Sequence, residues 1–302
     1  MKIIFATRPS ALARWQTAHV IRLLQAAHPG LECREHIITT KGDRVLDRPL
    51  SEIGGKGLFT SELENALMLG EVDAAVHSLK DLPVEDTPGI VVAAIPEREA
   101  AHDVLVSANG YTLSNLPEGA RVGTCSLRRT AQLLALRPDL TIFPLRGNVD
   151  SRVRKVLNGE YDAIILAHAG LTRLGLQSHI SETFALNVML PAPGQGALAV
   201  QCRADDVESL KLFSAIHDPL TAAAVNAERA FLSGLDGGCS LPVAAFAEKN
   251  NGTIILTGAV ISPDGKLAIR LSAVDKDPFE LGERLAHLVL ERGAAEILKA
   301  TA

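Results

Sequence analysis

Arginine is concentrated in one stretch of this chain. Between residues 121 and 155 there are eight basic residues, seven of them Arg, and only two acidic ones, although the whole chain has a net charge of −5. A planar guanidinium group binds carboxylates and phosphates through paired hydrogen bonds. Arg128 and Arg129 fall near an expected helix start, where cations oppose the helix dipole, so a bound anion would resolve the conflict. An ordinary solvated helix face is the alternative.

Two further residues are candidates for chemistry. Asp81 follows a buried-type strand in the segment His77-Ser78-Leu79-Lys80-Asp81, and a carboxylate there could stabilise a cation or move a proton. The alternative is a carboxylate that caps a turn or helix. Cys239 lies in a glycine-flanked turn, where an accessible thiolate is a nucleophile or a covalent attachment point. The alternative is an ordinary free thiol. The glycine-rich run 54–57 lacks the spacing of a phosphate-binding Walker motif.

Composition excludes several classes of protein. The chain has 302 residues, 47% of them hydrophobic and 22% charged, which predicts a globular protein of two or three domains. Its 8 Phe, 2 Tyr and 1 Trp are too few for a nucleic-acid stacking surface. The 4 Cys are far apart, which indicates neither a disulfide framework nor a zinc site. Neither a signal peptide nor an 18-residue apolar stretch is present, so we expect a cytoplasmic protein without a membrane segment.

Hydrophobic patterns place these residues on an α/β scaffold. Strands and helices alternate from residue 3 to residue 201, which favours parallel sheets. Ser10 is expected to be the N-cap of a helix over 11–28, and Ser61 and Glu64 are spaced as a capping box. The segments 7–12 and 124–127 resemble each other: each follows a strand, opens a helix and offers hydroxyl and N–H groups that favour anions.

Two segments, 96–103 and 190–196, are hinge candidates because one is charged and the other is rich in Pro and Gly. From residue 219 the pattern changes. A helix over 221–235 is followed by three strand-like runs near 242–248, 253–261 and 266–274, with turn signals between them. This order predicts an α+β module with an antiparallel sheet.

Ten segments together resemble one protein family over nearly the whole chain. They are ATRPSALA (6–13), TKGD (40–43), GGKGLFT (54–60), DAAVHSLKDLP (73–83), GTCSLRR (123–129), LRGNVDSR (145–152), YDAIILAHAGL (161–171), LPAPGQGALAV (190–200), AERAF (227–231) and GGCSLP (237–242). The chain thereby resembles porphobilinogen deaminase, also called hydroxymethylbilane synthase.

The resemblance implies an α/β fold with two lobes like those of type II periplasmic binding proteins, each a doubly wound sheet. A small α+β third domain with a three-stranded antiparallel sheet completes it. Domain 1 is expected to be discontinuous and to carry the catalytic Asp, over 1–96 and 197–216. The Arg-rich domain 2 is expected over 101–190, and domain 3, which carries the cofactor Cys, over 219–302.

The resemblance also implies a reaction of tetrapyrrole biosynthesis. Such an enzyme deaminates porphobilinogen, condenses four units in turn onto a dipyrromethane cofactor, and releases hydroxymethylbilane. The cofactor is expected on Cys239 through a thioether. No metal, nucleic acid or membrane is expected, and we expect a monomer in the cytoplasm, or in the plastid stroma if a transit peptide has been removed. The competing class is a two-lobed anion-binding protein without catalysis.

Matching of the family motifs assigns the site residues. The catalytic residue is Asp81. Cofactor-binding residues are Cys239, Asp81, Ser78, Lys56, Thr124, Ser126, Arg128, Arg129, Arg146 and Gly147. Substrate-binding residues are Arg8, Ser10, Arg146, Arg152, Arg173 and Gln195.

The charge pattern fits this assignment, because every pyrrole unit bears an acetate and a propionate. The resemblance also implies a buried carboxylate, Asp81, near the cation that forms when ammonia leaves. Two residues depart from the common pattern: Cys125 replaces Ser, and Glu52 replaces Lys and is left out of the binding set. Arg137 lies outside the matching segments and its replacement by Leu is expected to be close to neutral.

Overall fold

The computed structural model describes residues 2–44, 57–235 and 241–300. The chain divides into two compact units. Unit 1 consists of Met1–Glu99 and Ala197–Ala222, and unit 2 consists of Ala100–Gly196 and Ala223–Ala302. Each unit is therefore built from two separate parts of the sequence, and the chain passes from unit 1 to unit 2 and back.

The elements of the first part of the chain are β1 (Lys2–Thr7), α1 (Ala11–Ala27), β2 (Glu32–Ile37), α2 (Lys41–Arg44), α4 (Ser61–Met68), β3 (Ala74–Ser78), a 3₁₀ turn (Leu79–Asp81) and β4 (Ile90–Ala94). Those of the second part are β5 (Asp103–Val106), β6 (Arg121–Gly123), α5 (Leu127–Leu136), β7 (Thr141–Phe143), α6 (Val149–Leu157), β8 (Ala163–Ala167), α7 (His168–Arg173), a 3₁₀ turn (Gln177–His179) and β9 (Ile180–Thr183).

The last third contains β10 (Leu198–Arg203), α8 (Val207–Phe213), a 3₁₀ turn (Ser214–Ile216), α9 (Pro219–Ser233), β11 (Val243–Asn250), β12 (Thr253–Ile261), β13 (Ala268–Asp275), α10 (Pro278–Val289), a π-helical turn (Leu290–Ala294) and α11 (Ala295–Lys299).

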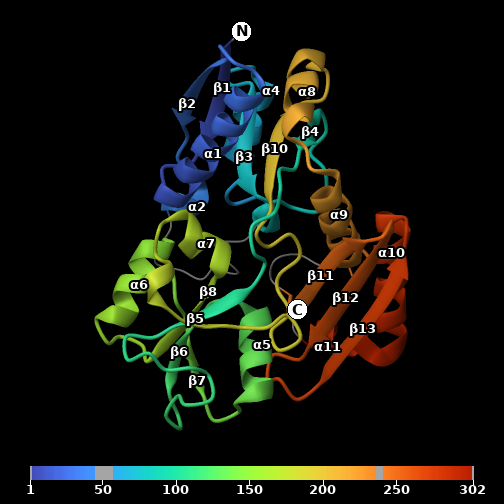
Figure 1. Cartoon of the computed structure of the whole chain (residues 1–302). Helices are drawn as coiled ribbons and strands as arrows, with labels where there is room; N and C mark the ends of the chain where they lie inside the picture. Colours follow the sequence, from blue (N-terminus) through green and yellow to red (C-terminus); the bar gives the residue numbers. More distant parts are fainter. Residues whose placement is uncertain (1, 45–56, 236–240, 301–302) are drawn as a thin grey trace. The chain divides into compact units, whose positions relative to one another are not determined.

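Two five-stranded sheets have the same topology. The order is β2-β1-β3-β10-β4 in unit 1 and β7-β6-β8-β5-β9 in unit 2. The first three strands of each order are parallel, whereas β10 and β5 run antiparallel to both of their neighbours. Figure 1 shows β10, far along the chain, between β3 and β4. The prediction of parallel sheets was therefore wrong for these strands, because a buried apolar strand has the same pattern in either direction.

Helices cover both faces of each sheet. In unit 1, α1 and α8 pack on one apolar cluster, around Phe5 and Phe213, while α4 packs on another that includes Leu63 and Leu67. In unit 2, α5 contributes Leu133 to one cluster, and α6 and α7 line the opposite one. The α/β class of the prediction is thus confirmed for both sheets.

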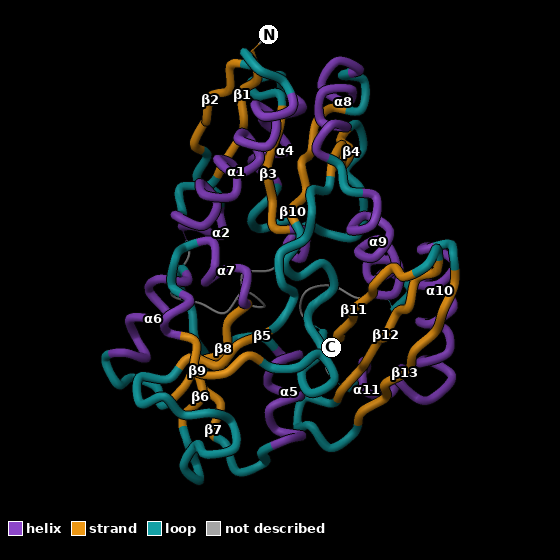
Figure 2. The backbone as a smooth tube through the Cα atoms, in the orientation of Figure 1, coloured by secondary structure: helices purple, strands orange, loops and turns teal. Residues whose placement is uncertain are grey.

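The predicted three-stranded antiparallel sheet is present, in the order β11-β12-β13 (Figure 2). Its core contains Phe231 of α9 and Leu285 of α10. Within unit 2, the turn between β12 and β13 approaches α5 closely. A Cβ at Gly265, whose φ is +74°, would lie 2.4 Å from the Ala135 backbone nitrogen, so this position requires glycine.

Candidate functional site

Asp81 lies in the 3₁₀ turn that directly follows β3, at the carboxyl end of that strand. Its side chain is exposed, in contrast to the buried carboxylate that the resemblance implied. It makes no hydrogen bond or ion pair within the described part of the chain, and no side-chain cap bond is present in this turn. The alternative of a capping carboxylate is therefore not supported, and Asp81 is available to a ligand.

Ser10 and Ser78 lie at the ends of elements of unit 1. Ser10 is the N-cap of α1 and accepts a hydrogen bond from the Ala13 amide at 3.3 Å, as predicted. Ser78 ends β3, and its Oγ accepts a bond from Gln16 Nε2 at 2.8 Å. Both hydroxyl groups are held in place by α1.

Arg8 follows β1 and already has an acidic partner. Its Nε is 3.2 and 3.1 Å from the two carboxylate oxygens of Asp43, and its guanidinium lies 4.1 Å above the ring of Phe59. Burial alone would raise the pKa of Asp43, but the bonds from Arg8 and Thr40 outweigh it and lower that pKa. A substrate carboxylate at Arg8 would share the guanidinium with Asp43.

Arg128 and Arg129 are buried, and an anion that pairs with both of them is part of the protein. Asp103, at the start of β5, is 0% exposed and accepts bonds from Arg128 Nη1 at 2.6 Å and from Arg129 Nη2 at 2.7 Å. Burial opposes ionisation of Asp103, yet the two guanidinium groups hold its pKa far below the usual range. One anion at this helix start is thus supplied by the protein itself, as Asp103.

The remaining basic residues of 121–155 divide into two groups. Arg121, Arg137 and Arg154 form ion pairs with Asp162, Asp139 and Asp150, respectively, with side chains 21–69% exposed. Of these, Arg154 on α6 fits the alternative of a solvated helix face, whereas Arg121 lies in β6 and Arg137 is half-buried at the end of α5. Arg152 of α6 instead donates from Nε to the Gly147 carbonyl at 2.7 Å.

Arg146, which follows β7, has no such partner. It makes no hydrogen bond or ion pair within the described residues, and its Nη1 is buried. A buried N–H group without an acceptor is costly, so it indicates a place for an anion. The next residue, Gly147, has φ +112°, a conformation that favours glycine.

Thr124 and Ser126 lie between β6 and α5, and the corresponding Thr7 and Ser10 are the last residue of β1 and the N-cap of α1. Ser126 is the N-cap of α5, accepting from the Arg129 amide at 3.4 Å, and Thr124 Oγ1 accepts from the Ser126 amide at 3.1 Å. The resemblance between the two segments therefore reflects equivalent places in two sheets of equal topology.

Arg173 and Gln195 are more buried than a substrate contact requires. Arg173 is 7% exposed and donates to the Gly196 carbonyl at 2.6 Å. Gln195 is 0% exposed, and its Nε2 donates to the Ala101 carbonyl at 2.7 Å and to Asp103 at 3.0 Å. Both side chains hold the backbone where the chain enters or leaves unit 2.

Three residues of the sequence analysis lie outside the described residues, namely Lys56, Cys239 and Glu52. Cys125 is described, as an exposed free thiol. Sequence reasoning missed Asp103 and Asp43, the two acidic partners of the predicted arginines. The signal for Asp103 was a charged residue directly before the apolar run Val104–Val106, since a buried charge needs a partner.

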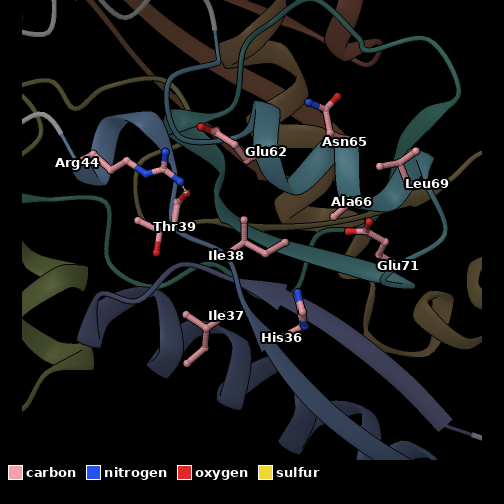
Figure 3. A pocket seen from close by; sticks show the side chains of 10 residues that line it. All are labelled: His36, Ile37, Ile38, Thr39, Arg44, Glu62, Asn65, Ala66, Leu69 and Glu71. Carbon is pink, nitrogen blue, oxygen red and sulfur yellow. Dashed lines mark hydrogen bonds between the residues drawn. The ribbon is translucent and has the colours of Figure 1, made fainter.

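A separate surface pocket of 460 Å³ lies in unit 1 beside the end of β2 and along α4 (Figure 3). Among the side chains around it are Ile37, Arg44, Glu62 and Leu69. It contains none of the predicted site residues, and its lining is mixed in charge. We therefore do not include it in the candidate site.

Two α/β sheets each place hydroxyl and arginine side chains at a helix start, an arrangement that suits an anionic ligand. The chain belongs to the porphobilinogen deaminase family. Residues 3–211 match the family model described as "Porphobilinogen deaminase, dipyromethane cofactor binding domain", and residues 222–291 match that of the C-terminal domain.

Curated relatives extend this match over nearly the full chain. It is 50% identical to a porphobilinogen deaminase of Brevibacillus brevis, over 97% of this chain and 95% of the relative. It is 49% identical to one of Maridesulfovibrio salexigens, over 98% and 97%. Among solved structures, a Bordetella pertussis BvgS VFT2 domain is 15% identical, with a TM-score of 0.43, over 76% of this chain and 91% of that domain.

The residues present fit a dipyrromethane cofactor. Such a group carries carboxylates, and unit 2 offers the buried, unpartnered Nη1 of Arg146 together with the hydroxyl groups of Thr124 and Ser126. Guanidinium and hydroxyl donors of this kind suit a carboxylate. No described helix is long and apolar enough to cross a membrane.

Proposed function

We propose that this chain catalyses the reaction of its family, in which porphobilinogen loses ammonia and four units are joined into hydroxymethylbilane. The observation that carries the proposal is the unpartnered state of Asp81 and Arg146, in a chain that matches the family over residues 3–211. Asp81 follows β3 in unit 1 and Arg146 follows β7 in unit 2, and neither side chain has a hydrogen-bond or ion-pair partner among the described residues.

Asp81 would act on the charge that develops at the substrate. Loss of ammonia leaves a cation on the pyrrole, and an ionised carboxylate beside it would stabilise that cation. The same carboxylate can accept and return the protons that deamination and condensation require. Its exposed position and its freedom from other bonds support this role.

The arginines would hold the acetate and propionate groups. In unit 2, Arg146 and Arg152 flank Gly147 in sequence, and Ser126 and Thr124 add hydroxyl donors; in unit 1, Arg8 and Ser10 follow β1. Bidentate arginine contacts fix the orientation of a carboxylate as well as its position. The dipyrromethane, when bound through Cys239, supplies an electron-rich pyrrole to which the first substrate unit is joined.

We further propose the domain organisation and setting of the enzyme. The matched segments support a discontinuous domain 1 (1–96 and 197–216), a domain 2 (101–190) and a domain 3 (219–302). The free thiols of Cys33, Cys125 and Cys202 support the reducing cytoplasm as its compartment. We propose a monomer that binds no nucleic acid, which size-exclusion chromatography with light scattering and a duplex-binding titration would test.

Intact-protein mass spectrometry combined with a porphobilinogen assay tests the function. The purified chain should exceed its sequence mass by two condensed pyrrole units and should convert porphobilinogen to hydroxymethylbilane. Cys239→Ser should yield neither the added mass nor turnover. An active Cys239→Ser protein without added mass would refute the cofactor assignment, and a wild-type chain that binds porphobilinogen without turnover would favour the anion-binding alternative.

A further inference from the structure

The buried arginine pair of α5 uses its donors unequally. Arg129 commits all three of its guanidinium nitrogens: Nε and Nη2 donate to Asp103 Oδ1 at 3.1 and 2.7 Å, and Nη1 donates to the Ile165 carbonyl at 3.1 Å. Arg128 commits only Nη1, which donates to Asp103 Oδ2 at 2.6 Å and to the Leu190 carbonyl at 2.7 Å. Within the described residues, its Nε and Nη2 make no bond.

Asp103 is the common acceptor of this cluster. Its Oδ1 serves Arg129 and also Gln195 Nε2 at 3.0 Å, while its Oδ2 serves Arg128. All four side chains are at most 7% exposed. One carboxylate therefore faces two guanidinium groups, and one positive charge of the pair remains uncompensated.

A buried uncompensated charge is strongly unfavourable, so the cluster favours the arrival of one further anion. In Arg129 the edge formed by Nε and Nη2 is already occupied by Asp103, whereas in Arg128 Nε and Nη2 are open. These two nitrogens form the edge of the guanidinium that binds a carboxylate through two parallel bonds.

We propose that Asp103 is a positioning residue, which fixes Arg129 to the scaffold and turns Arg128 so that its Nε and Nη2 can bind one carboxylate of an oligopyrrole. The inference rests on the proposed function, because that function supplies the carboxylate-bearing ligand. It divides the predicted pair: Arg128 binds, and Arg129 supports.

A double-mutant cycle between Asp103 and Arg128 tests this division. Asp103→Asn, Arg128→Gln and the double variant would be compared as full-length chains. The first readout is the rate at which unloaded protein gains the mass of the cofactor when porphobilinogen is added. The second is the KM for porphobilinogen, measured on molecules that carry the cofactor. Loading reports on the cofactor carboxylates and KM on those of the substrate.

We expect each single variant to slow loading or raise KM at least tenfold, with kcat changed by less than threefold. The double variant should be no worse than Arg128→Gln alone, because Asp103 acts through Arg128. If Asp103 contributed independently of Arg128, the fold-change of the double variant in loading rate or KM would instead be the product of the two single fold-changes. Multiplied effects, or an Asp103→Asn protein with loading and KM within twofold of wild type, would overturn the proposal.

Folding is controlled by two further variants. Asp103→Asn with Arg129→Gln removes one charge of each sign, so it should fold even if Asp103→Asn alone does not, and it should show the same loading defect. Asp139→Asn removes a carboxylate from a half-buried ion pair of the same unit and should load normally. If neither Asp103 variant gives a folded circular dichroism spectrum, Asp103 serves the fold alone and the proposal fails. An inactive wild-type chain would refute the proposed function instead.

Discussion

In unit 2, the inserted antiparallel strand β5 begins with Asp103, and every polar atom of that carboxylate is bonded to a buried donor. In unit 1, the inserted strand β10 of the corresponding sheet carries Gln201, which lies opposite Ala75 of β3. Its Nε2 donates to Glu64 at 3.0 Å, but its Oε1 is buried without a partner, as is Nε2 of nearby His77. The sheet of unit 2 buries an ion cluster around a fully bonded carboxylate, whereas the sheet of unit 1 buries two neutral side chains, Gln201 and His77, that are only partly bonded.

This difference indicates two ways of stabilising one topology. Paired buried ions fix side-chain positions, and removal of one partner lowers the free energy of unfolding strongly. Partly bonded neutral groups cost stability but leave atoms that can accept a proton or a water molecule. We therefore expect unit 2 to respond strongly to substitution and unit 1 to respond to pH.

The largest expected effect is on unit 2. Arg129→Gln removes two charge-assisted bonds to the buried Asp103 and the bond to the Ile165 carbonyl, and the loss of a hydrogen bond to a charged group costs roughly 1.5–3 kcal/mol. Urea unfolding followed by circular dichroism would measure the free energy of unfolding. Arg154→Gln is the matched control, because Arg154 is 69% exposed and pairs with an exposed acid, so about 0.5 kcal/mol or less is expected. Equal losses in the two variants would contradict the comparison.

Asp81→Asn should separate catalysis from stability. Asp81 is exposed and unpartnered, so the free energy of unfolding should stay within about 0.5 kcal/mol of wild type. Its rate of covalent substrate addition to pre-assembled holoenzyme should fall at least ~10²-fold, because a charge aimed at the transition state is lost. Asp81→Glu keeps the charge and should lose less.

The measurement for Asp81 is single-turnover mass spectrometry of the enzyme–substrate species. Asp86→Asn is the control, because Asp86 is exposed and follows Asp81 by five residues. Asp81→Asn holoenzyme that forms these species at the wild-type rate would remove Asp81 from the mechanism.

Arg146→Leu should weaken binding without weakening the fold. Its buried Nη1 has no partner, so its removal costs no internal bond. Loss of one charge-assisted bond to a carboxylate is worth about 1.5–3 kcal/mol, roughly 10- to 150-fold in affinity. The KM for porphobilinogen and the unfolding midpoint would be measured together. A lowered midpoint with unchanged KM would assign Arg146 to the structure.

Arg137→Leu is a poor control for this experiment. The sequence analysis expected it to be close to neutral, but Arg137 bonds to Asp139 and donates to the Leu113 and Leu116 carbonyls. Its replacement should therefore destabilise unit 2. Arg154→Leu is the appropriate comparison for Arg146→Leu.

The smallest expected effect is the response of unit 1 to pH. Burial lowers the pKa of His77 to about 4, with the nearby Arg8 charge adding to the shift and Gln201 opposing it. The unfolded chain, with a His pKa of about 6.5, binds a proton first. The contribution of His77 to the free energy of unfolding is thus fully present above about pH 6.5 and is lost as the pH falls from there toward 4.

Lowering the pH from 7 to about 5.5 should reduce the free energy of unfolding by about 1 kcal/mol through His77. Urea unfolding of wild type and of His77→Gln at both pH values checks this, and the variant should lose that part of the pH dependence. His36→Gln, at an exposed position, should not change it. A His77→Gln protein with the wild-type pH dependence would show that other groups are responsible.

Local features of the fold were predictable from sequence, and long-range pairings were not. Ser10 was identified as an N-cap because that signal lies within four residues. The capping box at Ser61 and Glu64 was wrong: Thr60 precedes the helix, and Glu64 is used by Thr87 and Gln201. The partner of Arg128 lies 25 residues away on a strand whose position follows from the topology, so spacing alone could not show it.

The insertion of β10 between β3 and β4 has a consequence for synthesis. Every strand pair of the second sheet falls within residues 103–183, whereas the first sheet needs residues 198–203 to join its edge strand β4 to the rest. A chain emerging from the ribosome can therefore complete the second sheet while β3 and β4 of the first sheet still lack β10, their common neighbour. Pairing across so long a loop is slow, and unpaired edges aggregate. The N-terminal strands, although made first, should be among the last to gain a finished sheet and the part that most needs protection by chaperones.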